Sequence, residues 1–295
     1  GFMKGNPLFI IDDEADAASL NTLVNKGQQS SINKYLDSIK NGASSSIYLQ
    51  VTGTPQAIFL QTMASGWHPY FTHYFEPGDG YLGGDFFFPK NKTADCIAFL
   101  EKTTRPERSV AIHHLAVSGQ ILASGGKVCN CLIHPSVRQA VHGRYEKAMQ
   151  GELSWCLDHI DDEFRTELHN AYDELHPEKS LKVDFEAVFT AVKELLESHA
   201  VKVLVMNGKH NVDSSEYSSG SNIVIGGNTL GRGVTFPALH TIYYTRTSKK
   251  PQADTMWQHS RMFGYDRDPG MMKVYIDEPL YKLFSDINAT NNSII

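Results

Sequence analysis

The apolar run at residues 7–11 constrains the fold most, because it ends abruptly in acidic side chains. The acids that follow it are Asp12, Asp13, Glu14 and Asp16. Four consecutive apolar residues predict a strand buried on both faces, as in parallel sheets. Open α/β sheets bind ligands beyond the carboxyl ends of their strands. The sequence therefore predicts an α/β fold with a functional site at the end of this strand. The simpler alternative is a helix N-terminus, where the dipole favours acids.

Net charge and hydropathy patterning limit the class of protein. The 295 residues carry a formal net charge of −6. A protein that grips many phosphates usually has a basic surface, so we expect this chain to bind DNA only weakly. No apolar run reaches the roughly eighteen residues of a membrane span, and the opening residues do not resemble a secretory signal. We therefore expect a cytoplasmic protein with no membrane segment.

The cysteines and histidines do not form a recognisable metal motif. The four cysteines include no Cys-x-x-Cys pair, and we expect them to be reduced and buried. The 13 histidines lack the His-x-x-x-His and His-Glu-x-x-His spacings of zinc sites.

Strands and helices are expected to alternate along the chain, which favours parallel sheets. Runs rich in β-branched and aromatic residues predict strands at 46–51, 128–133, 201–206, 222–225, 239–244 and 274–276. A helix is expected over 105–126, closed by Gly125-Gly126, and a charged amphipathic helical stretch over 142–200. A loop or short hairpin is expected over 76–92.

These elements predict two lobes. The first covers residues 1–95, and the second covers 105–285 with the helical stretch 142–200 as an insertion. Residues 286–295 are expected to form a frayed tail.

Three further motifs follow predicted strands. Thr52-Gly53-Thr54-Pro55 ends the second strand and places two hydroxyl groups at the same sheet edge as the acids. Residues 226–236 are rich in glycine, which lets a backbone approach a ligand closely. Arg232 stands among these glycines as a cation suited to a phosphate or a carboxylate. A purely structural loop is the alternative.

The third of these motifs, residues 258–267, contains two arginines. Gln258 and Arg261 are expected on one helical face, and Arg267 lies just beyond Gly264. Arginines in such a place can stabilise the γ-phosphate of a nucleotide, or they can form surface ion pairs.

The order of these motifs resembles the RecA-like motor cores of superfamily-two helicases and translocases. More closely, the chain resembles the Z-one domain family, helicase-related modules in proteins often labelled as endonucleases and found in restriction systems. The segments that carry the closer resemblance are 11–16, 52–55, 132–136, 230–233 and 261–265. His-Pro-Ser and Arg-x-Phe-Gly-Tyr are its more specific parts.

The resemblance implies roles for the residues near the beginning of the chain. Asp13 matches the magnesium-holding position, and Glu14 matches the position that activates water. Thr52 and Thr54 match the motif that couples hydrolysis to nucleic-acid contact, and Asp16 is expected to hydrogen-bond with that motif.

The resemblance also implies roles in the second lobe. Asn228 and Thr229 are expected at the nucleic-acid contact. The residues expected to touch the nucleotide are Gly231, Arg232, Gly233 and Gln258. Arg261 and Arg267 are the candidate arginine fingers. The common Gln-x-x-Gly-Arg-x-x-Arg spacing is not found, so the choice between them stays open.

The sequence contains no Gly-x-x-x-x-Gly-Lys-[Ser/Thr] phosphate-binding loop. We therefore expect a portion of a longer ATP-dependent DNA translocase or remodelling module from a restriction or anti-phage system. In this view the fold is two RecA-like lobes, the first incomplete, whose acids and arginines face each other across a shared crevice. ATP and Mg²⁺ would bind only together with the missing loop, and this chain alone would be inactive.

Two other functions are compatible with the sequence. A metal-dependent endonuclease would use the acids at 12–16, but restriction-type nucleases need a Glu-x-Lys element that the chain lacks. A non-catalytic scaffold would dock a nuclease or restriction-system partner through the helical insertion.

Overall fold

The structure of the protein is a computed structural model. It describes residues 6–16, 19, 21, 28–54, 58–59, 69–136, 138–207, 212–227, 230, 234–247, 256–258 and 260–294. The chain divides into two compact units, Gly1–Glu76 with Asn291–Ile295, and Pro77–Thr290. Both contain parallel strands and helices, so the α/β fold class predicted from sequence is confirmed.

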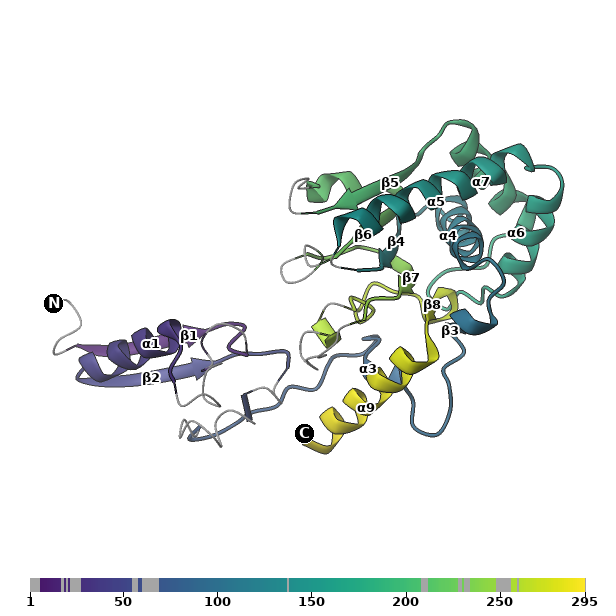
Figure 1. Ribbon diagram of the computed structural model, residues 1–295. Coiled ribbons are helices and arrows are strands. Elements are labelled where there is room, and N and C mark those ends of the chain that lie inside the picture. Colours follow the sequence, from purple (N-terminus) through teal and green to yellow (C-terminus); the bar gives the residue numbers. More distant parts are fainter. Residues whose placement is uncertain are drawn as a thin grey trace. The chain divides into compact units, whose positions relative to one another are not determined.

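The first unit contains a two-stranded parallel sheet. β1 (Pro7–Asp12) pairs with β2 (Ser45–Gln50) so that Asp12 lies opposite Gln50, and the two strands end at the same edge. Between them in sequence, α1 (Ser31–Gly42) begins after Ser30, whose side chain accepts a hydrogen bond from the backbone of Asn33. The ammonium group of Lys40 in α1 lies 5.0 Å from the ring centroid of Tyr48 in β2. The helix therefore covers the face of the sheet that carries Tyr48 (Figure 1).

The other face of this two-stranded sheet is apolar and exposed. Phe9 and Ile11 of β1 are 60% and 62% exposed, and Ile47 of β2 is 68% exposed. The prediction that the opening strand is buried on both faces is therefore wrong within this unit. Alternate side chains of a strand point to opposite faces, and among the described residues of the unit α1 covers one face alone.

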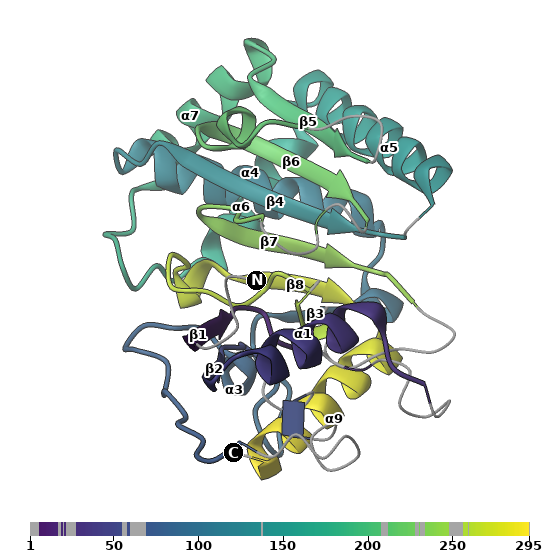
Figure 2. The same ribbon diagram turned by 90° about the vertical axis from the view of Figure 1, so that its left-hand side faces the viewer.

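The second unit is built on a six-stranded parallel sheet in the order β3-β8-β7-β4-β6-β5. Its strands are β3 (Ile97–Phe99), β4 (Val128–His134), β5 (Val201–Met206), β6 (Gly220–Gly226), β7 (Leu239–Tyr244) and β8 (Lys273–Ile276). The strands run in one direction beside each other, with β4 near the middle (Figure 2). β7 is buried along its whole length and β4 along all but its first residue, as expected for central parallel strands. All seven strands predicted from the sequence are present, five of them in this sheet, and β3 was not predicted.

Four helices pack on one face of the six-stranded sheet. They are α4 (Pro106–Ala123), α5 (Gln139–Asp158), α6 (Glu163–Asp173) and α7 (Phe185–Glu197). Their core meets the sheet at Cys129, Cys131 and Ile133, alternate residues of β4. The expected helix at 105–126 corresponds to α4, and the expected helical stretch at 142–200 corresponds to α5 through α7. The four cysteines are free and buried, as predicted.

A second apolar core lies on the opposite face of the sheet, and residues from the beginning and the end of this unit pack in it. The core includes α3 (Gly84–Phe87) and α9 (Glu278–Ile294), and the rings of Phe88 and Phe284 stack with centroids 5.4 Å apart. Because Phe87 and Phe88 are buried here, residues 77–95 belong to the second unit, and not to a first lobe that reaches residue 95. The expected frayed tail at 286–295 is helical as far as Ile294, because Phe284 and Ile287 anchor α9 in the core.

None of the helices in the described residues has the length and apolar character that a bilayer span requires.

Candidate functional site

The acids near the beginning of the chain lie on a tight turn directly after β1. Residues 13–16 form this turn, and the Glu14 backbone N–H donates to the Asp13 carboxylate at 2.9 Å. Asp13 and Glu14 are both exposed. Glu14 has a φ of 52°, a left-handed conformation that costs a non-glycine residue about 1 kcal/mol. The alternative of an acidic N-cap does not apply to α1, which begins only at Ser31.

Asp16 joins this acidic turn to the Thr-Gly-Thr motif. Its carboxylate is only 5% exposed and accepts two hydrogen bonds, from the Thr52 hydroxyl at 2.8 Å and from the Thr54 hydroxyl at 2.7 Å. The Thr54 backbone N–H donates to the Thr52 hydroxyl at 3.0 Å. The expectation that Asp16 hydrogen-bonds with the threonine motif is therefore confirmed. The parallel register brings the two motifs together, because β1 and β2 end at the same edge.

Asp12 is held apart from the other acids by β2. The Tyr48 hydroxyl donates a hydrogen bond to the Asp12 carboxylate, on the face that α1 covers. Burial, reinforced by the neighbouring Asp12, raises the pKa of Tyr48 above its ordinary value, so the tyrosine stays a donor. Asp12 thus has a structural partner, and Asp13 and Glu14 remain as the accessible carboxylates of the turn.

In the second unit, candidate residues gather at the carboxyl ends of β4, β6 and β7. His134 is the last residue of β4, and its ring nitrogen Nε2 lies 3.2 Å from the Gly227 carbonyl, just after β6. The same Nε2 lies 3.3 Å from Nη1 of Arg246, two residues after β7. The sequence pointed to His134 through the His-Pro-Ser motif but gave no signal for Arg246. A single arginine after a strand carries no motif, and only strand order reveals its neighbours.

The two candidate arginines lie together but in different environments. Nε of Arg261 donates to the Leu230 carbonyl at 2.7 Å, which connects the arginine segment to the residue just before the Gly-Arg-Gly motif. Arg267 is 6% exposed, and its guanidinium donates to the Asp266 carboxylate at 2.9 Å and to the Arg261 carbonyl at 2.8 Å. Burial lowers the pKa of Arg267, against the opposing effect of Asp266.

Gln258 and Arg261 do not share a helical face, which corrects the sequence-based expectation. Gln258 is helical, but Arg261 has a φ of 54°, a left-handed conformation outside any helix. The remaining candidates of the glycine-rich loop, which are Asn228, Thr229, Gly231, Arg232 and Gly233, lie outside the described residues. Because the acids and the arginines belong to different units, the shared crevice between them stays a prediction.

A buried polar network in the second unit was not anticipated from sequence. The His114 Nε2 lies 2.9 Å from the Ser221 hydroxyl, which in turn lies 2.9 Å from the Ser118 hydroxyl. All three side chains are fully buried, and burial lowers the pKa of His114 to about 3. A neutral, inaccessible histidine fixes the packing of α4 on the sheet and does not act on a ligand.

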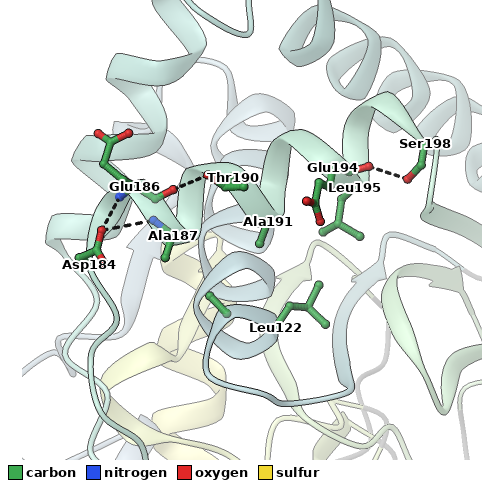
Figure 3. Close-up of a pocket in the computed structure, with 10 residues that line it drawn as sticks. Leu122, Asp184, Glu186, Ala187, Thr190, Ala191, Glu194, Leu195 and Ser198 are labelled. Atoms are coloured by element: carbon green, nitrogen blue, oxygen red, sulfur yellow. Dashed lines mark hydrogen bonds between the residues drawn. The ribbon is translucent and has the colours of Figure 1, made fainter.

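A surface groove of about 850 Å³ lies between the end of α4 and α7 (Figure 3). Leu122 and Leu195 line it together with acidic residues, among them Asp184, whose carboxylate caps α7. None of the residues singled out from the sequence lines this groove. Among the described residues, no group of three or more histidine, cysteine or acidic side chains is arranged to hold a metal ion.

The chain is similar to a known protein family. A family profile described as the Z1 domain matches residues 108–295, which include most of the second unit. No curated protein matches the chain.

Proposed function

The chain belongs to the Z1 domain family, and we propose that it is part of a helicase-like ATPase module that acts on DNA in a restriction or anti-phage system. The observation that carries this proposal is the Asp16 carboxylate bound by Thr52 and Thr54 beside the exposed Asp13 and Glu14. An ATPase that moves on DNA needs accessible acids beside the phosphates of the nucleotide. It also needs a rigid connection from those acids to the surface that contacts DNA. The turn after β1 supplies both.

The exposed acids fit the chemistry of magnesium and water. Mg²⁺ binds through one or two carboxylates and keeps several waters, so Asp13 needs no further protein ligand beside it. When bound with ATP, Mg²⁺ neutralises charge on the phosphates. Asp13 would hold the metal through its carboxylate, and Glu14 would accept a hydrogen bond from the attacking water and orient it.

The threonines would transmit the state of this turn. Because Asp16 is bound to both hydroxyls, a shift of the acidic turn moves the end of β2 with it. The Thr-Gly-Thr segment is then the element whose position differs between nucleotide states, and DNA contact at this segment would be coupled to hydrolysis. We propose that the phosphate-binding loop comes from a segment outside these residues, and that a nuclease or restriction partner acts on the same DNA.

The test is DNA-stimulated ATP hydrolysis by the full-length gene product that contains this chain. Glu14→Gln keeps the size of the side chain but removes its charge and replaces one acceptor oxygen with an N–H donor, so it should lower the rate by about 10²–10³-fold. Glu76→Gln, at an exposed position of the same unit, is the matched control and should hydrolyse normally. Normal hydrolysis by Glu14→Gln would refute the assigned role. Magnesium-dependent nicking of plasmid that Asp13→Ala abolishes would favour the nuclease alternative instead.

A further inference from the structure

Strand order identifies a second place where this fold is suited to bind a ligand. β4 and β7 are neighbours in the sheet, but the chain leaves β4 toward β5 on one side and leaves β7 toward β8 on the other. In open α/β sheets, ligands bind at the carboxyl ends of strands where the connections diverge in this way. The residues at that point are His134, at the end of β4, and Arg246, just after β7.

Two contacts at His134 make incompatible demands on one atom. Nε2 lies 3.2 Å from the Gly227 carbonyl, which requires Nε2 to carry a proton and donate. The same Nε2 lies 3.3 Å from Nη1 of Arg246, which is always a donor and requires Nε2 to accept. A neutral imidazole satisfies one of these contacts, and an imidazolium repels the guanidinium. In every protonation state, therefore, one of the two contacts is unfavourable.

The geometry also shows which partner is able to move. His134 is fully buried, and its carbonyl accepts a hydrogen bond from the Thr245 backbone at 3.2 Å, so its ring is fixed between the strands. Gly227 follows β6 directly and is buried. Arg246 is half-buried, and its guanidinium is carried by a long side chain. The guanidinium is therefore the group that can turn toward a ligand.

From these contacts we propose that Arg246 binds a phosphate group at this edge of the sheet. A guanidinium presents paired donors that match phosphate oxygens, and it stays charged. When Arg246 turns to a phosphate, Nε2 of His134 carries the proton and donates to the Gly227 carbonyl, so the unfavourable contact disappears. Binding thereby fixes the turn after β6. The phosphate belongs to a nucleotide or to a nucleic-acid strand, which share this chemistry. The site does not depend on the hydrolysis proposed above.

The test follows the His134 ring nitrogens by NMR in the full chain labelled with ¹⁵N-histidine. His134→Gln identifies the signals by their loss. Inorganic phosphate, ADP and a single-stranded oligonucleotide are added separately. We expect the Nε2 signal to move toward the protonated form as a probe saturates, and the probe that acts at the lowest concentration identifies the source of the phosphate.

Arg246→Gln separates binding from structure. In this variant Nε2 should be protonated without any probe, and the affinity for the effective probe should fall about tenfold. Arg144→Gln, which alters an exposed arginine of α5, is the matched control and should bind as the wild type does. Arg246→Lys keeps the charge and should bind more tightly than Arg246→Gln.

The proposal is overturned if none of the three probes changes the His134 signals, or if Arg246→Gln binds the probe as tightly as the wild type. Neither readout involves ATP hydrolysis, so normal hydrolysis by Glu14→Gln would refute the role assigned to Glu14 and leave this result unaffected.

Discussion

Acidification should destabilise the second unit through its buried histidines. Burial lowers the pKa of His114 to about 3 and that of His240 to about 4, against an ordinary value of 6.5. His240 also has a defined tautomer, because its Nε2 accepts a hydrogen bond from the Asp268 backbone at 3.0 Å and its Nδ1 lies 3.0 Å from the Ala238 carbonyl. A proton on Nε2 would break the first of these bonds.

The sign follows from where the proton binds. The folded state keeps both histidines neutral, whereas the unfolded chain takes up protons below its pKa of about 6.5. Stability is therefore complete above that pH and declines as the pH falls toward about 4 for His240 and about 3 for His114. Between pH 7 and pH 5, each histidine should lower the free energy of unfolding by about 2 kcal/mol, or about 4 kcal/mol for the two. Burial also lowers the pKa of His113, which acts in the same direction.

Urea unfolding followed by circular dichroism at pH 7, 6 and 5 measures this loss. Replacing His114 and His240 with glutamine should lower stability at pH 7 but flatten the pH dependence by about 4 kcal/mol. His169→Gln, at an exposed position of α6, should leave the pH dependence unchanged. Equal losses between pH 7 and pH 5 in the wild type and in the double variant would show that other groups cause the acid sensitivity.

Three further outcomes are expected. Asp16→Ala leaves the hydroxyls of Thr52 and Thr54 without their shared acceptor and should cost about 2–3 kcal/mol, seen as faster hydrogen exchange in β2; unchanged exchange would contradict this. Glu14→Gly removes the cost of holding a residue with a Cβ in the left-handed conformation, and it should stabilise the chain by about 1 kcal/mol in urea unfolding. The same change should lower the rate of the proposed ATP hydrolysis. A loss of stability would refute the strain argument. Asp268→Ala removes the acceptor of three backbone N–H groups, from residues 178, 179 and 270. It should lower the free energy of unfolding by about 3 kcal/mol, measured by thermal unfolding. A loss below about 1 kcal/mol, the value of an exposed salt bridge, would mean that water replaces the carboxylate.

The parts of the fold that could be predicted are those with a strong local pattern. β4 and β7 are runs of apolar and β-branched residues that have to be buried wherever they pair, so their existence follows from sequence. β3 has only three residues, Ile97–Phe99, which is too short for periodicity to reveal. α9 resembled a tail because its last residues are polar, but Phe284 and Ile287 anchor it to a core that assembles from distant segments.

The candidate site could be predicted where the parallel pairing of two strands is enough to bring their terminal residues together. The acids and the threonines each end a strand, and parallel strands of one sheet end at one edge, so the contact of Asp16 with Thr52 and Thr54 follows from the pattern. The contact between Arg246 and His134 depends on which strands are neighbours, and strand order is not written in the local sequence. Exposure of Phe9 and Ile11 was likewise unpredictable, because a strand does not encode what packs on each of its faces.

The structure also distinguishes the two arginines that the sequence left equivalent. Arg267 uses its buried guanidinium to hold the Arg261 carbonyl and the Asp266 carboxylate, and a side chain at Gly264 would reach within 1.7 Å of its Nη1. An arginine packed in this way cannot turn toward a phosphate without leaving a cavity and removing the cation that pairs with Asp266. Arg261 is half-buried, is held in a left-handed conformation and contacts Leu230 beside the glycine-rich loop. Within the proposed ATPase, the arrangement therefore favours Arg261 as the residue that contacts phosphate and Arg267 as the residue that positions it. Arg267→Lys would then raise KM and lower kcat through a displaced Arg261, whereas Arg261→Lys would lower kcat with the fold intact.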